Sequence, residues 1–122
     1  MELSSNFIID KNVIPNSVTH LKISIDENET WKHIPSSVTQ LEVTYYKSYK
    51  KKWVPPNVSH LVFQKYDKKC APRNIPLHVE SVTYKYVEYA HKQDQPEMFD
   101  MYDIPSHIKT ITLGPLKIRN VF

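Results

Sequence analysis

Lysines and aromatic rings alternate in the middle of the chain. Residues 47–73 hold seven lysines and one arginine against one aspartate, a net charge of +7, whereas all 122 residues together carry +3. Lysines interleaved with tyrosine and tryptophan can hold phosphates while the rings stack on bases. The segment therefore predicts a basic patch for an acidic protein or a nucleic acid. The patch comprises Lys47, Lys50, Lys51, Lys52, Lys65, Lys68, Lys69 and Arg73.

The same segment also fits a structural interpretation. Tyr46 and Tyr66 occupy matched places 20 residues apart. This spacing is expected if the tyrosines fill a core behind a solvated basic surface. On that interpretation the lysines serve only solubility.

Several other kinds of chemistry are disfavoured. Phosphate-cradling loops need glycines at fixed offsets, and the chain has one glycine. A single cysteine forms no internal disulfide, which points to a reducing compartment. Cys70 lies among lysines, which favour a reactive thiolate, but a surface or half-buried thiol is the simpler expectation. No apolar run approaches the ~18 residues of a membrane span. We expect a soluble cytoplasmic protein that makes no membrane contact and is not an enzyme.

The elements that position these residues are revealed by an internal repeat. Five of the nine prolines follow a β-branched residue and open similar strings. The strings are IPNSVTHLKI from Ile14, IPSSVTQLEV from Ile34, VPPNVSHLVF from Val54, IPLHVESVTY from Ile75 and IPSHIKTITL from Ile104. The residues one before and three, six and eight after each proline are apolar or aromatic in every copy. The intervals between these anchor prolines are 20, 20, 21 and 29 residues.

Each copy predicts one β-strand entered at its proline, because apolar residues alternate with polar or mixed ones after it. About a dozen residues then remain before the next copy, roughly the minimum for a crossover to a parallel neighbour. We therefore expect a mainly β, leucine-rich-repeat-like solenoid with one parallel sheet of about five strands. Its return segments should be irregular or short helices.

One face of this sheet is predicted to meet solvent at the positions five, seven and nine after each proline. These are His20, Lys22, Ser24, Gln40, Glu42, Thr44, His60, Val62, Gln64, Ser81, Thr83, Lys85, Thr110, Thr112 and Gly114. Neighbouring strands lie ~4.8 Å apart, so ladders such as His20–Gln40–His60 and Lys22–Glu42–Val62 should form. Such a face is commonly a partner-binding surface, and the alternative is a solvated sheet with local pairs.

The histidines do not predict a metal site. His20 and His60 fall two strands apart, ~10 Å, which is too far to share one metal ion. His78 and His107 share a repeat position on adjacent strands, but no carboxylate or thiol is expected beside them. We expect no metal, no cofactor and no catalytic residues.

The string IP-x-S-V-T-x-L, present from Ile14 and again from Ile34, resembles the FNIP repeat, a relative of the leucine-rich repeat found in social-amoeba and giant-virus proteins. The copy from Val54 is close, and the two later copies are degraded. The family's phenylalanine–asparagine pair is missing from every copy. The resemblance implies a repeat module that binds other proteins, in the host cytoplasm if the chain is viral.

The predicted organisation is an N-terminal cap at 1–13, five repeats over 14–114 with an insertion at 88–103, and a C-terminal cap at 115–122. The repeats start near residues 14, 34, 54, 75 and 104. We expect a protein-interaction module that uses the sheet face and the basic patch, for a partner of acidic character. Nucleic-acid binding through 47–73 is the alternative, and self-assembly through the solenoid ends is the third candidate. The expected state is a monomer or an end-to-end homodimer.

Overall fold

The computed structural model describes the strand of every repeat. It covers residues 2–3, 14–23, 34–44, 49–66, 68–86, 104–114 and 116–119. Ser24, Lys47 and the predicted insertion at 88–103 lie outside the described residues, as do most of the two predicted caps.

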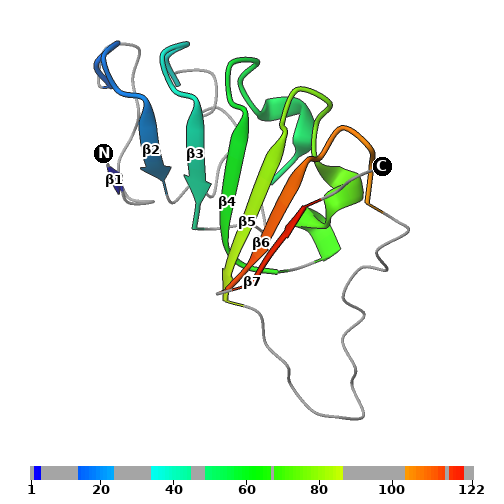
Figure 1. Cartoon of the computed structure of the whole chain (residues 1–122). Coiled ribbons are helices and arrows are strands. Elements are labelled where there is room, and N and C mark those ends of the chain that lie inside the picture. The colour runs from blue at the N-terminus through cyan, green and yellow to red at the C-terminus, as the bar shows by residue number, and fades with distance from the viewer. Residues whose placement is uncertain are drawn as a thin grey trace.

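One sheet dominates the described residues (Figure 1). Its seven strands are β1 (Glu2–Leu3), β2 (His20–Ile23), β3 (Gln40–Val43), β4 (His60–Lys65), β5 (Ser81–Tyr86), β6 (Thr110–Leu113) and β7 (Leu116–Arg119). The strands follow each other in chain order, and all neighbours are parallel except β6 and β7. The repeat predicted β2 to β6, so the mainly β fold with an open parallel sheet of five strands is confirmed. β1 and β7 extend this sheet at its two edges.

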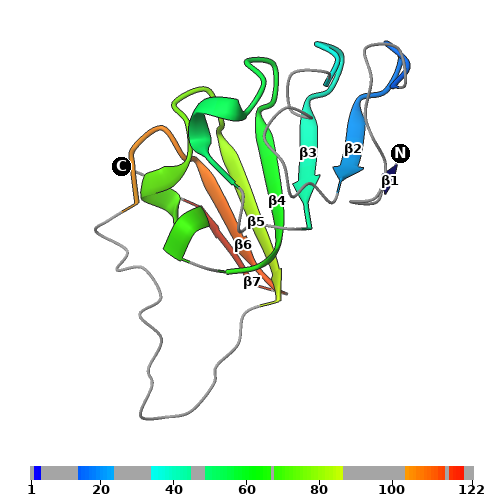
Figure 2. The same ribbon diagram turned by 180° about the vertical axis from the view of Figure 1, so that it is seen from behind.

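The helices of the described residues are short 3₁₀ turns between the strands. They are η3 (Lys51–Trp53), η4 (Lys68–Cys70) and η5 (Pro72–Asn74). All three lie on one side of the sheet, in front of it in Figure 2. No helix of the described residues lies over the other face. The described parts of the return segments therefore lie on one face of the sheet.

The anchor prolines begin a β-turn rather than the strand itself. In each repeat the proline carbonyl accepts a hydrogen bond from the amide three residues later, at 3.1 to 3.2 Å. The strand begins five residues after the proline in all five repeats. The prediction that the strand is entered at the proline is therefore wrong by one turn. Proline suits the position because it lacks an amide hydrogen and has a restricted φ.

The strands pair in register, so equivalent positions of successive repeats stack. His20, Gln40 and His60 are direct partners across β2, β3 and β4, and so are Lys22, Glu42 and Val62. The predicted ladders are therefore confirmed. Just before each strand, one carbonyl accepts two amides of the next repeat. The Thr19 carbonyl, for example, accepts the amides of Thr39 at 2.8 Å and Gln40 at 3.1 Å.

A second ladder joins the turns through side chains. In three repeats, the side chain two residues after the anchor proline donates to a backbone carbonyl of the preceding repeat. These bonds are Ser37 Oγ to Val18 O at 2.7 Å, Asn57 Nδ2 to Ser36 O at 2.8 Å and His78 Nε2 to Pro55 O at 2.9 Å. His107 holds the same position in the last repeat, but its buried Nε2 has no hydrogen-bond partner among the described residues.

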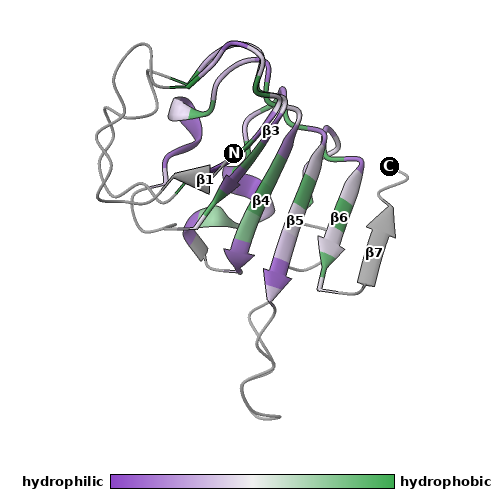
Figure 3. Cartoon of the chain, turned by 90° about the vertical axis from the view of Figure 1, so that its left-hand side faces the viewer, coloured by the Kyte–Doolittle hydropathy of each residue, from purple (hydrophilic) through white to green (hydrophobic). Residues whose placement is uncertain are grey.

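The core consists of the apolar positions that the repeat predicts. All are buried except Val18 in the first repeat and Ile104 in the last, which pack half-buried against the rest. Hydropathy alternates along the strands in Figure 3, as expected for a sheet with one covered face. Val18 and Ile104 belong to the first and last repeats, each of which has another repeat stacked on one side only.

Aromatic rings fill the space between the sheet and the returns of the middle repeats. Phe63 stacks on Tyr84 with ring centres 5.8 Å apart, and the edge of Tyr49 meets Phe63 at 5.2 Å. Tyr66 packs against Tyr84 at 5.3 Å, so the interpretation of Tyr66 as a core residue is confirmed. Burial raises the pKa of both Tyr49 and Tyr84, which keeps their hydroxyls protonated as donors. Tyr84 donates to the Cys70 carbonyl.

The single glycine marks the place where the chain reverses direction. Gly114 has a φ of +55°, a conformation that side chains with a Cβ rarely adopt. It lies directly after β6, and the pairing of Leu113 with Leu116 closes a two-residue hairpin to β7. Its amide donates to the Tyr84 carbonyl at 2.8 Å, which ties the reversal to β5. The parallel succession of strands ends here.

The buried hydroxyl of Tyr84 offers a test of the aromatic core. Tyr84→Phe keeps the ring but leaves the buried Cys70 carbonyl without its donor, so the free energy of unfolding should fall by about 1–3 kcal/mol. Tyr86→Phe is the matched control, because Tyr86 is 65% exposed and should change nothing measurable. Urea denaturation measures both variants. Equal stabilities of Tyr84→Phe and the wild type would contradict the assigned hydrogen bond.

Candidate partner-binding surfaces

The uncovered face of the sheet holds most of the predicted sheet-face residues. His20 and Lys85 are exposed. The half-buried members are Lys22, Gln40, Thr44, His60, Gln64, Ser81, Thr83, Thr110, Thr112 and Gly114. The register brings these side chains together in rows across the strands.

Glu42 corrects the prediction of solvent exposure, since it is only 8% exposed. Its carboxylate is covered by neighbours from three strands. Lys85 Nζ lies 2.9 Å from one oxygen, Lys22 Nζ lies 3.8 Å from the other, and Gln64 donates to that second oxygen. Glu42 is thus the centre of a polar cluster within the sheet face, and its carboxylate is not exposed for contact with a partner.

Val62 is the second correction, at 4% exposed. Its direct partners on the neighbouring strands are Glu42 and Thr83. His60 and Gln64 flank it on the same face, two residues away along its own strand. Most of these neighbours have longer side chains than Val62 and cover it from solvent. Its strand position had predicted that it faces solvent.

Other polar side chains of the sheet face also form hydrogen bonds within the sheet. His60 Nε2 lies 2.8 Å from the Thr83 hydroxyl, and the Thr44 hydroxyl donates to the Ile23 carbonyl at 3.2 Å. A partner on this face must therefore compete with bonds that already exist. The hydroxyls of β5 and β6 form two rows on this face, with Ser81 beside Thr110 and Thr83 beside Thr112.

His78, one of the two turn histidines, is already hydrogen bonded. His78 uses its Nε2 to bond the Pro55 carbonyl, which removes that nitrogen as a free ligand. In the part of the chain that the structure describes, no three histidine, cysteine, aspartate or glutamate side chains gather as a metal ion requires.

Cys70 is a further correction, because it is fully buried rather than at or near the surface. Its thiol lies 3.7 Å from the Lys65 carbonyl, and its own carbonyl receives the Tyr84 hydroxyl. Cys70 ends η4, and it belongs to the hydrophobic core. Its burial follows from the packing of this return on the aromatic core, which the neighbouring lysines in the sequence do not reveal.

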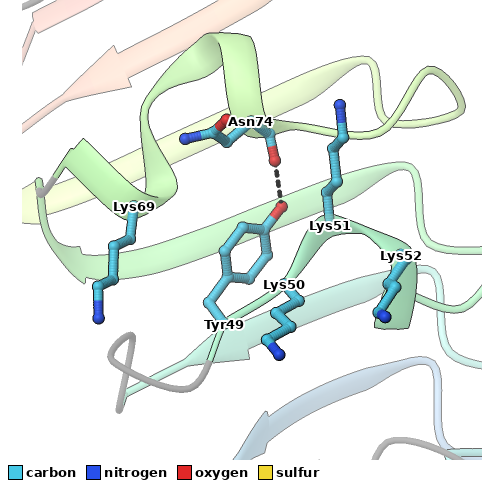
Figure 4. Close-up of a pocket in the computed structure, with 6 residues that line it drawn as sticks. All are labelled: Tyr49, Lys50, Lys51, Lys52, Lys69 and Asn74. Carbon is cyan, nitrogen blue, oxygen red and sulfur yellow. Dashed lines mark hydrogen bonds between the residues drawn. The ribbon is translucent and has the colours of Figure 1, made fainter.

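The basic patch surrounds two adjoining hollows on the return side. The first hollow, of about 380 Å³, is lined by Tyr49, Lys50, Lys51, Lys52, Lys69 and Asn74 (Figure 4). The second, of about 460 Å³, is lined by Lys51, Lys52, Arg73, Ile75, Pro76, Leu77, Pro105 and His107. Lys51 and Lys52 line both hollows. Cations from successive returns therefore meet, as the repeat interval predicts.

The Tyr49 hydroxyl fixes the geometry of the first hollow. It donates to the Asn74 carbonyl at 2.7 Å and so ties the chain two residues before η3 to the end of η5 in the next return. Around it, the side chain of Lys51 points the opposite way from those of Lys50, Lys52 and Lys69, whose ammonium groups lie apart from one another (Figure 4). The positive charge is thus spread along a surface and does not converge on one point.

Some of the patch charges have a described partner and others do not. Lys50 Nζ lies 4.9 Å from the centre of the Trp53 ring, a cation–π contact. Lys51, Lys52 and Arg73 form no ion pair with any residue of the described ranges. Of the other predicted members, Lys65 lies in β4 and lines neither hollow, and Lys68 lies in η4.

The rings next to the lysines are used inside the protein. Tyr49 is buried, and Trp53 and Tyr66 pack half-buried against the core. Rings held in this way are not free platforms on which bases stack.

The second hollow contains residues that the sequence analysis did not group with the patch. Leu77, Pro105 and His107 belong to the fourth and fifth repeats, whose prolines are 29 residues apart. Only the stacking of the turns places them beside η3. The shared repeat position of His78 and His107 is the feature of the sequence that places both histidines in adjacent turns.

Comparisons with protein-family models, with curated proteins and with solved structures give no match for this chain. Within the described residues, no helix has the length and apolar character needed to cross a membrane. The function must therefore be argued from the surfaces themselves.

The Glu42 cluster provides a test of the sheet face. Glu42→Gln removes the charge that holds two half-exposed lysines, so the free energy of unfolding should fall by about 1 kcal/mol. Glu80→Gln removes a charge from an exposed position with no described ion pair, and it should leave stability unchanged. Added salt should narrow the gap between the wild type and Glu42→Gln in urea denaturation. A gap that persists unchanged at high salt would mean that charge is not its cause.

Proposed function

We propose that this chain is a leucine-rich-type repeat module that binds an acidic segment of a partner protein. One observation supports this most strongly. Five cationic side chains from successive returns line two adjoining hollows, and three of them have no ion pair among the described residues. A surface of this kind attracts negative charge and accelerates encounter with an acidic partner.

The solenoid architecture is part of the proposal. It is supported by the same proline turn in five repeats, by strands that follow chain order, and by returns on one side of the sheet. Repeat arrays of this type expose extended surfaces, which suits a partner segment that runs across several repeats.

The two predicted surfaces have different roles in this proposal. The lysines of the return side are spread in direction, which fits an extended acidic segment better than one small ion. The sheet face, whose polar centre is already bonded around Glu42, would add shape selectivity through the hydroxyls of β5 and β6.

Nucleic-acid binding is the less favoured alternative. It needs exposed rings between the lysines, and the described rings of this segment pack against the core. Self-assembly is the third candidate, and β1 and β7 are the edge strands through which the sheet would extend. A catalytic role for the only thiol is not proposed, because Cys70 is fully buried.

A charge-reversal experiment tests the proposal. A fluorescent polyglutamate peptide serves as the acidic probe, and anisotropy measures its binding. Lys51→Glu combined with Lys52→Glu should weaken binding at least tenfold, and affinity should fall steeply as salt rises. Lys109→Glu is the control, because Lys109 is exposed and lines neither hollow, and it should have an effect below about threefold.

Two outcomes of this experiment would overturn the proposal. Equal losses in the double variant and in Lys109→Glu would mean that only overall charge matters. Clearly tighter binding of a single-stranded oligonucleotide of equal charge, lost in the same double variant, would favour the nucleic-acid alternative. Light scattering in parallel separates both from self-assembly, which requires a dimer or larger species in the absence of any probe.

A further inference from the structure

The second hollow differs in chemistry from the rest of the basic patch. One part of its lining is cationic, with Lys51, Lys52 and Arg73. Another part is apolar and includes Pro76, Pro105 and Leu77, a leucine that is 82% exposed. A ligand that fits this lining combines a strong negative charge with a neighbouring apolar group.

His107 adds a polar group without a described partner to the same lining. Its Nε2 is buried without a hydrogen bond among the described residues, whereas Ser37, Asn57 and His78 all use this repeat position to bond a carbonyl. A buried polar atom without a partner is unfavourable, and a bound acceptor oxygen would remove that penalty. The nitrogen is covered by protein, so the imidazole must turn about its Cβ–Cγ bond, a soft torsion in histidine, to meet a ligand.

The donor set suits a phosphoryl group better than a carboxylate. A phosphorylated side chain carries a charge near −2 and three acceptor oxygens, which can engage several donors at once. The planar guanidinium of Arg73 can bond two of those oxygens side by side, and the two lysines supply point charges. A carboxylate carries one negative charge and would neutralise less of the positive charge of Lys51, Lys52 and Arg73.

From these observations we infer that the second hollow binds a phosphorylated side chain of the partner protein, with an adjacent apolar residue of the partner against Pro76, Leu77 and Pro105. This inference rests on the proposed function and specifies the partner's chemistry. Among the described residues, no phenylalanine, tyrosine or tryptophan lines this hollow, which favours a phosphopeptide over a nucleic acid, whose bases stack best on such rings.

A set of matched peptides tests the inference. The probes are three peptides of one sequence, leucine-rich around a central residue that is phosphoserine, aspartate or serine. Isothermal titration should show the phosphoserine peptide binding at least tenfold more tightly than the aspartate peptide. The imidazole resonances of His107, assigned by comparison with the His107→Phe variant, should shift with the phosphoserine peptide and with inorganic phosphate.

Variants separate this site from the bulk charge of the patch. Arg73→Gln should reduce affinity for the phosphoserine peptide at least tenfold. Lys69→Gln removes the same charge from the neighbouring hollow alone and should reduce it by less than threefold. Equal losses in the two variants would overturn the inference, as would equal affinity for the phosphoserine and aspartate peptides.

His107→Phe distinguishes a ligand-binding role from a structural one. It removes the nitrogen that has no described partner, so the thermal midpoint should stay the same or rise while phosphoserine affinity falls severalfold. A falling midpoint together with unchanged affinity would assign His107 to structure alone and overturn its part in the site.

The outcomes of the two proposals remain separable. If polyglutamate binds through Lys51 and Lys52 but phosphorylation adds nothing, the phosphoryl site fails and the proposed function stands. If inorganic phosphate shifts His107 but neither polyglutamate nor any of the three peptides binds, the proposed function fails, and with it the assignment of the phosphate to a protein partner. Stronger displacement of the phosphoserine peptide by a single-stranded oligonucleotide than by free phosphate would point to a nucleic acid instead.

Discussion

In-register parallel pairing of the repeats is the constraint on which the rest of this structure depends. Each strand position lies beside its equivalent in the next repeat, from β2 through β6. The side chain at each position therefore lies one strand spacing, ~4.8 Å, from the side chain at the equivalent position of the next repeat. Apolar positions become a continuous core, turn side chains become a ladder of hydrogen bonds, and lysines of successive returns become one basic surface.

The sequence predicts much of this because its signals are local and repeated. The apolar positions around each proline locate β2 to β6 and nearly all of the core. The sequence does not predict burial that depends on which side chains the neighbouring repeats carry. Glu42 and Val62 are covered because of what stands on the adjacent strands, and Cys70 is buried because a short helix folds onto a tyrosine of β5. Neither fact follows from the period of a strand.

The candidate site divides in the same way. The density of lysines in 47–73 predicts a basic surface. It does not predict that the surface is divided into two hollows, one polar around Tyr49 and one partly apolar beside His107. The second hollow takes residues from the repeats on either side of the longest interval, and nothing within a single repeat indicates that they meet. The described rings beside the lysines, Tyr49, Trp53 and Tyr66, pack in or against the core and are not available for stacking on bases.

The ladder of turn side chains also defines the modular unit of this chain. Each bond runs backward, from a side chain of one repeat to a carbonyl of the repeat before it. A carbonyl in one repeat is thus satisfied by a residue encoded about twenty positions later. Duplication or loss of one period among the first four repeats would keep these three donors matched to acceptors, since the neighbouring copy supplies the carbonyl, whereas His107 in the last repeat has no described acceptor. The length of such an array is consequently free to change during evolution, whereas the phase of its repeat is not.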